Sequence, residues 1–223
     1  VTPSDATRDE LLELGFRPDR VVAVPNGVDP AFCPGGDKTA SPSIIAVGRL
    51  APVKRFDLVI DAAVEARRTF PDLRLSIIGE GPLRDDLQRR IDDVGGRNWI
   101  EMLGRLDHLA LVDHYRRAWL VVSGSLAEGW GLSLTEGAAC GTPAVATDIN
   151  GHRSSVVAER TGRLVSDDLL GLAIVDVLAD DQLRRTFADA ALARAQTLTW
   201  EASAVGLTRC LHAEVVRCSR SAR

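Results

Sequence analysis

The chain has 223 residues, of which 45% are hydrophobic and 26% charged, and its formal net charge is −4 at pH 7. This composition is ordinary for a soluble globular protein, and the length suits one large domain with extensions. The negative charge argues against nucleic acid as a partner, because phosphate backbones are bound by clustered cations. No apolar run approaches the roughly 20 residues of a membrane-spanning helix, so no membrane span is expected.

None of the four cysteines has a partner at a C-x-x-C spacing, and no histidine stands at a spacing from them that is typical of a metal site. Cys140 is expected to be a small buried apolar residue. Reduced thiols favour a cytoplasmic location. The chain begins with Val1 rather than Met and shows no signal peptide, which suggests a fragment or a processed chain.

The first 42 residues differ in pattern from those that follow. A helix is predicted over residues 5–15 and a strand over residues 20–24, whereas residues 30–42 have the Pro, Gly and Ser content of a linker. From residue 43, apolar β-branched runs alternate with segments of helical periodicity. The strands are predicted at residues 43–47, 73–78, 99–103, 120–123, 144–146 and 161–165.

Helices are predicted between these strands, and Asp107 is expected to cap one of them. The alternation predicts the α/β class, with a Rossmann-like doubly wound parallel sheet and helices on both faces. Helices are also predicted in the last third of the chain, and the last five residues are expected to fray. From residue 43 to the end of the chain, the predicted helices cover residues 54–69, 82–94, 107–117, 132–140, 167–179, 181–195 and 200–218.

The most informative stretch is a glycine-rich turn that runs from Glu128 to Glu136 and opens a helix. Backbone N–H groups at such a turn favour an anion, usually a phosphate. Carboxylates beside that anion are better suited to accept hydrogen bonds from neutral hydroxyls. A phosphate site flanked by hydroxyl acceptors is what a sugar nucleotide needs.

Polar or glycine-rich loops follow several of the predicted strands. A parallel sheet binds its ligands at the carboxyl ends of its strands. We therefore expect these loops to open onto one edge of the sheet. They contain Gly48-Arg49, Gly79-Glu80-Gly81, Gly104-Arg105 and Glu128–Gly131.

A series of short motifs, in order, resembles the C-terminal half of glycosyltransferase family 4, whose retaining enzymes have the GT-B fold. The series covers residues 20–170. The motifs are Pro25–Asp29, Gly48–Asp57, Ile78–Pro82, Gly104-Arg105, Glu128–Glu136, Ala139–Pro143 and Thr161–Val165.

The resemblance implies a division of the chain into three parts. Residues 1–42 would be a remnant of the N-terminal domain with the crossover strand and a linker. Residues 43–198 would form the Rossmann-like domain that binds the nucleotide sugar, and residues 199–223 a C-terminal helix and frayed tail. The implied partner is a missing N-terminal acceptor-binding domain, which could attach the enzyme to the inner face of the membrane.

The resemblance also implies roles for cations and glycines. Arg49 and Lys54 would contact the donor diphosphate and stabilise its charge as it leaves. Gly48, Gly79 and Gly81 would lie at the nucleotide.

The turn itself, Gly129-Trp130-Gly131-Leu132, would hold the donor sugar and diphosphate through backbone amides. Glu136 would bind both ribose hydroxyls. Glu128 would accept hydrogen bonds from the transferred sugar and stabilise positive charge on its ring. The implied catalytic set is therefore Glu128, Arg49 and Lys54.

The resemblance implies that no metal or cofactor is needed, since the protein itself supplies the cations. The paired aspartates fall on or beside helices and form no Asp-x-Asp motif. His152 lies near the predicted site, and a structural or surface role is favoured for it. Two alternatives stay open: a non-catalytic nucleotide-sugar-binding subunit that needs an N-terminal partner, and a related GT-B enzyme such as a sugar-nucleotide epimerase. A nicotinamide-dependent dehydrogenase is excluded, because Gly48 is followed by Arg49 and Leu50 rather than by the G-x-G-x-x-G pattern.

Overall fold

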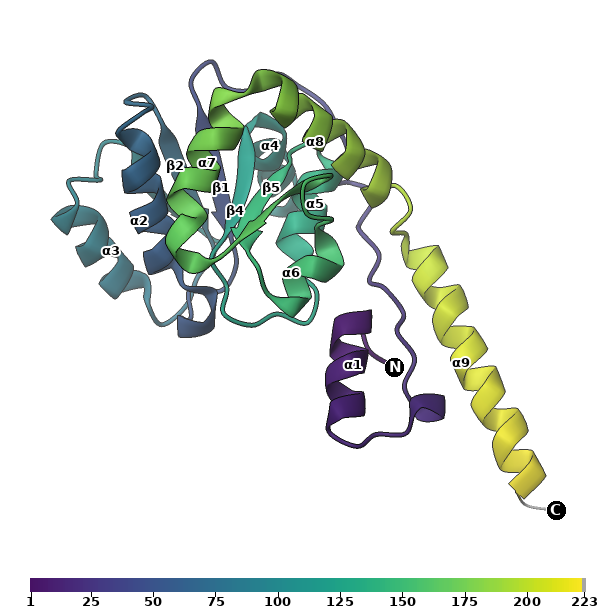
Figure 1. The fold of residues 1–223 in the computed structure, drawn as a ribbon. Coiled ribbons are helices and arrows are strands. Elements are labelled where there is room, and N and C mark those ends of the chain that lie inside the picture. Colours follow the sequence, from purple (N-terminus) through teal and green to yellow (C-terminus); the bar gives the residue numbers. More distant parts are fainter. Residues whose placement is uncertain (222–223) are drawn as a thin grey trace.

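A computed structural model describes residues 1–221 of the chain and shows a sheet covered by helices on both faces (Figure 1). The sheet has six strands in the order β3-β2-β1-β4-β5-β6, and every neighbouring pair is parallel. The direction of winding reverses between β1 and β4, which confirms the doubly wound α/β prediction. The strands are β1 (Ser43–Val47), β2 (Arg74–Ile78), β3 (Ile100–Gly104), β4 (Leu120–Ser123), β5 (Ala144–Thr147) and β6 (Gly162–Val165).

Helices cover the two faces of this sheet and also form both ends of the described chain. Short 3-10 turns occur at Pro18–Arg20, Pro52–Lys54 and Asp167–Leu169. The α-helices are α1 (Asp5–Glu13), α2 (Phe56–Arg67), α3 (Arg84–Asp93), α4 (His108–Arg117), α5 (Leu132–Ala139), α6 (Asn150–Ser155), α7 (Leu170–Ala179), α8 (Asp181–Ala195) and α9 (Trp200–Ser221).

The two faces of the sheet carry separate cores, because successive side chains of a strand point to opposite sides. In β1, Ile44 and Ala46 pack against α2, α3 and α7, whereas Ile45 faces the cluster that α4 and α5 complete. Both faces of the strands are therefore buried, which explains why the strands have nearly continuous apolar runs. The predicted cap of α4 is confirmed: Asp107 Oδ1 accepts a hydrogen bond from the Ala110 amide at 2.9 Å.

Several predicted elements differ from the structure. The helix predicted over residues 167–179 is a 3-10 turn followed by α7, and the helix predicted over residues 5–15 ends at Glu13. The segment 20–24 forms no strand of the sheet; Ala23 makes only an isolated bridge with Thr2. Helix α2 begins at Phe56 rather than residue 54, because Arg55 has a left-handed φ of 47° after the 3-10 turn. Helix α9 continues to Ser221, so residues 219–221 are helical rather than frayed; residues 222–223 lie outside the described part of the chain.

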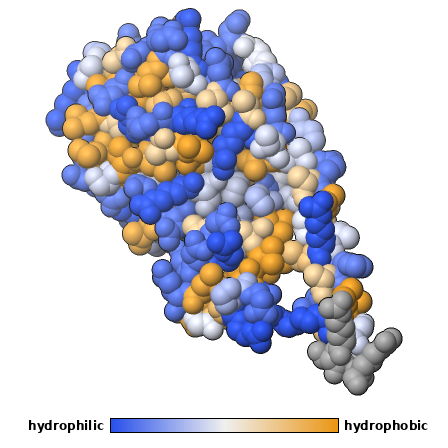
Figure 2. Space-filling view, turned by 45° about the vertical axis from the view of Figure 1, so that its right-hand side comes forward, coloured by the Kyte–Doolittle hydropathy of each residue, from blue (hydrophilic) through white to orange (hydrophobic). Residues whose placement is uncertain are grey.

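Helices α1 and α9 lie away from the sheet, at the lower end of the molecule in Figure 1. The crossover segment, residues 21–42 before β1, contacts the chain at the start of α9. The Val28 amide donates to the Leu198 carbonyl at 2.9 Å, and a Cβ on Gly27 would come within 2.4 Å of the Trp200 nitrogen. Apolar surface gathers at this end (Figure 2), where α9 exposes Leu211 and Val215. The domain boundaries after residues 42 and 198 stay predictions.

Candidate functional site

The loops after β1 and β2 touch at the carboxyl edge of the sheet because glycines remove the side chains that would separate them. Gly79 has a φ of 139°, and a Cβ there would lie 1.9 Å from the Gly48 carbonyl oxygen. A Cβ on Gly81 would lie 2.3 Å from the Leu50 carbonyl oxygen. The Gly79 amide also donates to the Gly104 carbonyl at 2.8 Å, so the loops after three neighbouring strands meet as expected.

Lys54 and Glu128 meet across the switch between β1 and β4. Lys54 ends the 3-10 turn after β1, and its Nζ forms a hydrogen-bonded ion pair with Glu128 Oε1. Only 25% and 14% of the two side chains are exposed, so water screens this pair less than a surface pair. The Lys54 stem crosses Gly48, where a Cβ would lie 3.6 Å from Lys54 Cε.

A second donor holds the same carboxylate of Glu128. The buried Ser125 donates from its Oγ to Glu128 Oε1 at 2.8 Å. Thr147, at the end of β5, donates from its Oγ1 to the Ser125 carbonyl at 2.8 Å. The sequence analysis did not identify Ser125 or Thr147. Glu128 is thus held by Lys54 after β1 and by Ser125 after β4, and Thr147 at the end of β5 fixes Ser125 in turn.

His152 supports this arrangement from inside α6. It is fully buried, its Nδ1 lies 2.7 Å from the Thr147 carbonyl oxygen and its Nε2 lies 3.1 Å from Ser123 Oγ. Burial lowers the pKa of His152, which keeps the imidazole neutral. A carbonyl can only accept, so Nδ1 carries the proton and Nε2 accepts from Ser123. The structural role favoured for His152 agrees with these contacts.

The glycine turn enters α5 through a left-handed residue. Gly131 has a φ of 89°, and a Cβ there would come within 3.0 Å of Ser155 Oγ. Trp130 is only 6% exposed, so it packs beneath the turn, and its Nε1 has no hydrogen-bond partner among residues 1–221. Gly129 and Leu132 are exposed. The turn therefore presents backbone rather than the indole to the edge of the sheet.

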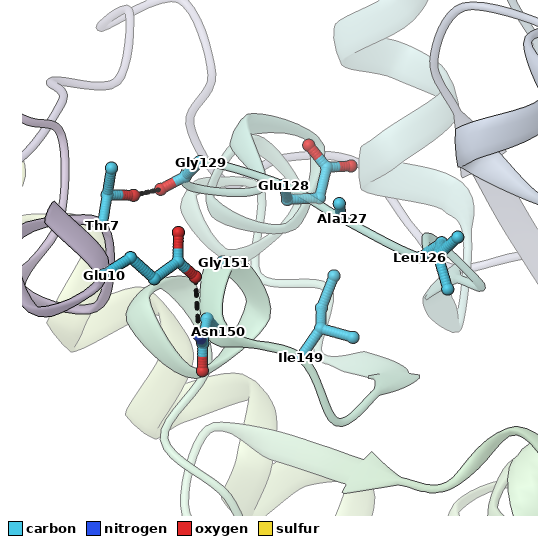
Figure 3. Close-up of a pocket in the computed structure, with 9 residues that line it drawn as sticks. All are labelled: Thr7, Glu10, Leu126, Ala127, Glu128, Gly129, Ile149, Asn150 and Gly151. Atoms are coloured by element: carbon cyan, nitrogen blue, oxygen red, sulfur yellow. Dashed lines mark hydrogen bonds between the residues drawn. The ribbon is translucent and has the colours of Figure 1, made fainter. Parts of the chain in front are cut away.

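Helix α1 forms one wall of an open pocket beside Glu128 (Figure 3). Thr7 donates to the Gly129 carbonyl at 3.4 Å, and Glu10 accepts from the Asn150 amide group at 2.6 Å. A Cβ on Gly151 would lie 2.2 Å from the Glu128 carbonyl oxygen, so α6 packs directly against the turn. The sequence analysis did not anticipate a contribution from α1 to this pocket.

Glu136 and Arg49 do not join the Lys54–Glu128 pair. Glu136 lies in α5, where its Oε2 accepts a hydrogen bond from the Tyr115 hydroxyl at 2.9 Å. Burial raises the pKa of Glu136 above its ordinary value. Arg49 follows Gly48 after β1 and is exposed, and its side chain has no hydrogen-bond or ion-pair partner within residues 1–221. Within those residues no group of three or more His, Cys, Asp or Glu is arranged to hold a metal ion.

Residues 34–194 match the family of glycosyl transferases group 1. The chain is 35% identical, over 92% of its length, to a D-inositol 3-phosphate glycosyltransferase of Kineococcus radiotolerans, and covers 54% of that protein. It is 32% identical, over 70% of its length, to a GDP-mannose-dependent phosphatidylinositol monomannoside mannosyltransferase of Mycolicibacterium smegmatis and covers 47% of it. The chain thus spans about half the length of these relatives.

Solved structures show the same fold. The C-terminal domain of a glycosyl transferase group 1 family protein (LpcC) of Francisella tularensis matches 77% of the chain with a TM-score of 0.68 and 25% identity, and 97% of that domain is covered. The Anabaena HepE complex with UDP-glucose matches 96% of the chain with a TM-score of 0.81 and 20% identity, and 63% of HepE is covered. The chain therefore has the Rossmann-like architecture of a GT-B C-terminal domain. Within the described residues, no helix is long and apolar enough to cross a membrane.

Proposed function

Because this chain belongs to the family of glycosyl transferases group 1, we propose that it binds the donor of a retaining glycosyltransferase. The donor is a nucleoside diphosphate sugar, and in the complete enzyme the sugar passes to an acceptor hydroxyl. The observation that carries this proposal is the Lys54–Glu128 ion pair, which puts a cation and a hydroxyl acceptor beside the glycine turn at the switch point of the sheet.

The similar proteins support a nucleoside diphosphate sugar as the donor. One relative is described as GDP-mannose-dependent, and the HepE structure holds UDP-glucose. Both donors share a diphosphate between a ribose and a sugar. The proposed site offers Lys54 and Arg49 to the diphosphate, Glu128 to the sugar and Glu136 to the ribose.

The charges of the site suit cleavage of the bond between sugar and diphosphate. Negative charge grows on the departing diphosphate, where Lys54, Arg49 and the backbone amides of the glycine turn stabilise it. Positive charge grows on the sugar ring, where the Glu128 carboxylate is held in place by Ser125. Lys54 exchanges its pairing with Glu128 for the phosphate oxygens when the donor binds, so both groups are oriented beforehand.

The acceptor would be bound by a domain that is not part of the sequence described. The relatives are about twice as long as the part that matches, which supports an additional N-terminal acceptor-binding domain. Helix α1 and the exposed apolar side chains of α9 lie at the end of the molecule where such a domain could pack. The cytoplasmic location and the attachment to the inner face of the membrane stay predictions.

Calorimetric titration of the chain with UDP, GDP and ADP tests the proposal. We expect one of them to bind, and Lys54→Ala to weaken its affinity by more than about tenfold, as loss of a charge-assisted contact to phosphate does. Arg68→Ala, which removes an exposed cation beside the carboxyl end of α2, serves as the control and should leave the affinity unchanged. Equal affinities of Lys54→Ala and the unaltered chain would contradict the proposed diphosphate site.

A further inference from the structure

We propose that Tyr115 is a positioning residue that orients the Glu136 carboxylate toward the ribose of the donor nucleotide. This inference rests on the proposed function and deepens it, because it names the side chain that sets ribose recognition. Tyr115 lies in α4 and Glu136 in α5, so the contact joins two helices on the same face of the sheet. Nothing in the sequence spacing brings these two residues together.

The contact is a directed hydrogen bond from a fully buried donor. Tyr115 is 0% exposed, and its hydroxyl donates to Glu136 Oε2 at 2.9 Å. Burial and the neighbouring Glu136 carboxylate raise the pKa of Tyr115 well above its ordinary value, so the hydroxyl keeps its proton. The hydroxyl is thus the donor of this bond, and Glu136 Oε2 is the acceptor.

This bond occupies one oxygen of Glu136 and leaves the other available. Oε1 accepts no hydrogen bond from any residue that the structure describes. A carboxylate oxygen has room for two donors, so Oε1 and the second site on Oε2 can accept the two hydroxyls of a ribose. Rotation of the carboxylate would break the Tyr115 bond, and the bond therefore holds both acceptor sites in one orientation.

The bond also offsets the cost of placing a charge in this position. Burial raises the pKa of Glu136, whereas the hydrogen bond from Tyr115 acts in the opposite direction and favours the ionised form. The other titratable groups that face Glu136 are His108, at the start of α4, and Asp29, in the crossover segment. Their effects oppose each other, which leaves Tyr115 as the main group that stabilises the carboxylate.

The packing around Tyr115 is built to keep the hydroxyl in place. A Cβ on Gly137 would come within 2.3 Å of Val121 Cγ2 and 3.4 Å of Tyr115 Cδ1, so a glycine is needed for α5 to approach the ring and β4. Phe32 packs edge-on against the ring, with centroids 5.7 Å apart. Thr142 donates to the Tyr115 carbonyl at 2.6 Å and anchors the end of α4.

Calorimetry with a pair of nucleotides separates positioning from a merely structural role. The chain is titrated with whichever of UDP, GDP and ADP binds it best, and with the 2′,3′-dideoxy form of the same nucleotide. We expect Tyr115→Phe to weaken the affinity for the ribonucleotide by about three- to tenfold, because the Glu136 carboxylate is no longer oriented toward the ribose. The affinity for the dideoxynucleotide should fall by less than about twofold. Phe32→Leu disturbs the same packing but keeps the hydroxyl, so it should preserve the wild-type preference for ribose.

If Tyr115→Phe loses affinity equally for both nucleotides, or loses none for either, the inference is overturned while the diphosphate site is left intact. Failure of the unaltered chain to bind any of the three nucleotides would instead reject the proposed function, and the inference with it. Tyr115 is the single tyrosine of the chain, which provides a second test that needs no variant. In a chain labelled with 3-fluorotyrosine, the one fluorine resonance should shift when the ribonucleotide binds and stay in place with the dideoxynucleotide; an identical response to both would also overturn the inference.

Discussion

Among single residues, Glu128 shows how two donors fix one carboxylate of the proposed site. Lys54 and Ser125 both donate to its Oε1, one from the loop after β1 and one from the loop after β4. Ser125 is in turn fixed by Thr147, and Thr147 lies beside the buried His152. A neutral imidazole in this position avoids a second positive charge next to Lys54, so the lowered pKa of His152 is part of the electrostatic design of the site.

The buried His152 should make the stability of the chain depend on pH. Its pKa lies below the ordinary 6.5, so the unfolded chain binds a proton that the folded chain excludes once the pH falls below 6.5. The free energy of unfolding is therefore largest above pH 6.5 and decreases toward acid, at up to about 1.4 kcal/mol per pH unit for one group. Urea denaturation from pH 7.5 to 5 should show this slope, and His152→Asn should reduce it.

The comparison uses the slope rather than the absolute stability, because His152→Asn also disturbs a packed position. His212→Asn is the matched control, since His212 is exposed on α9, and it should leave the pH dependence unchanged. The account of His152 fails if the His152→Asn curve runs parallel to that of the unaltered chain.

The sequence was enough to predict which residues belong to the proposed site, but not which side chains they contact. Lys54, Glu128 and the glycine turn stand in recognisable motifs, so their shared edge of the sheet was predictable. Ser125 and Tyr115 carry no such signal, because a serine or a buried tyrosine acquires its role only from the tertiary contact. His152 could be placed near the site from the sequence, but its contacts with Thr147 and Ser123 could not be predicted. The pairing of Tyr115 with Glu136 depends on how closely α5 packs against α4.

At the scale of elements, glycines decide how closely the loops after β1 and β2 approach each other. Gly79 combines a φ of 139° with a Cβ position 1.9 Å from the Gly48 carbonyl oxygen. An alanine would be strained by its backbone angle and would also push the two loops apart. Because Gly48 supports the Lys54 stem, such a shift would reach the cation of the site.

Gly79→Ala should therefore lower the free energy of unfolding by more than about 2 kcal/mol, at the upper end of the cost of a strained backbone position. Gly95→Ala is the control: Gly95 also has a positive φ, of 66°, but its Cβ would meet nothing within 4 Å. Urea denaturation of the two variants measures the difference. If Gly79→Ala lowers the free energy of unfolding no more than Gly95→Ala does, the contact between the loops after β1 and β2 is not tight.

The buried strands were predictable because both of their faces are apolar, and the helices between them were predictable because of their periodicity. The segment 20–24 has the same apolar pattern, yet within the described residues it makes only an isolated bridge with Thr2. The six-residue α6 was missed because Gly151 and the serines around it resemble a loop. It is helical because its backbone packs against Glu128, a contact that lies far away in sequence.

For the whole molecule, the fold places the proposed site at one edge of the sheet and leaves two helices, α1 and α9, beyond it (Figure 1). Helix α1 already contributes Thr7 and Glu10 to the pocket beside Glu128. One wall of this pocket is therefore built by residues that precede the sheet in the chain. The family match and the fold confirm the resemblance on which this interpretation rests.

The central claim is that a nucleoside diphosphate binds at the edge formed by Gly48, Arg49, Lys54 and the glycine turn. The most direct measurement is an amide chemical-shift titration of the isotope-labelled chain with the nucleoside diphosphate that binds best. The account predicts that the largest shifts fall on the amides of Arg49 and of residues 129–132. Shifts confined to the opposite edge of the sheet or to α9, with those amides unmoved, would contradict it.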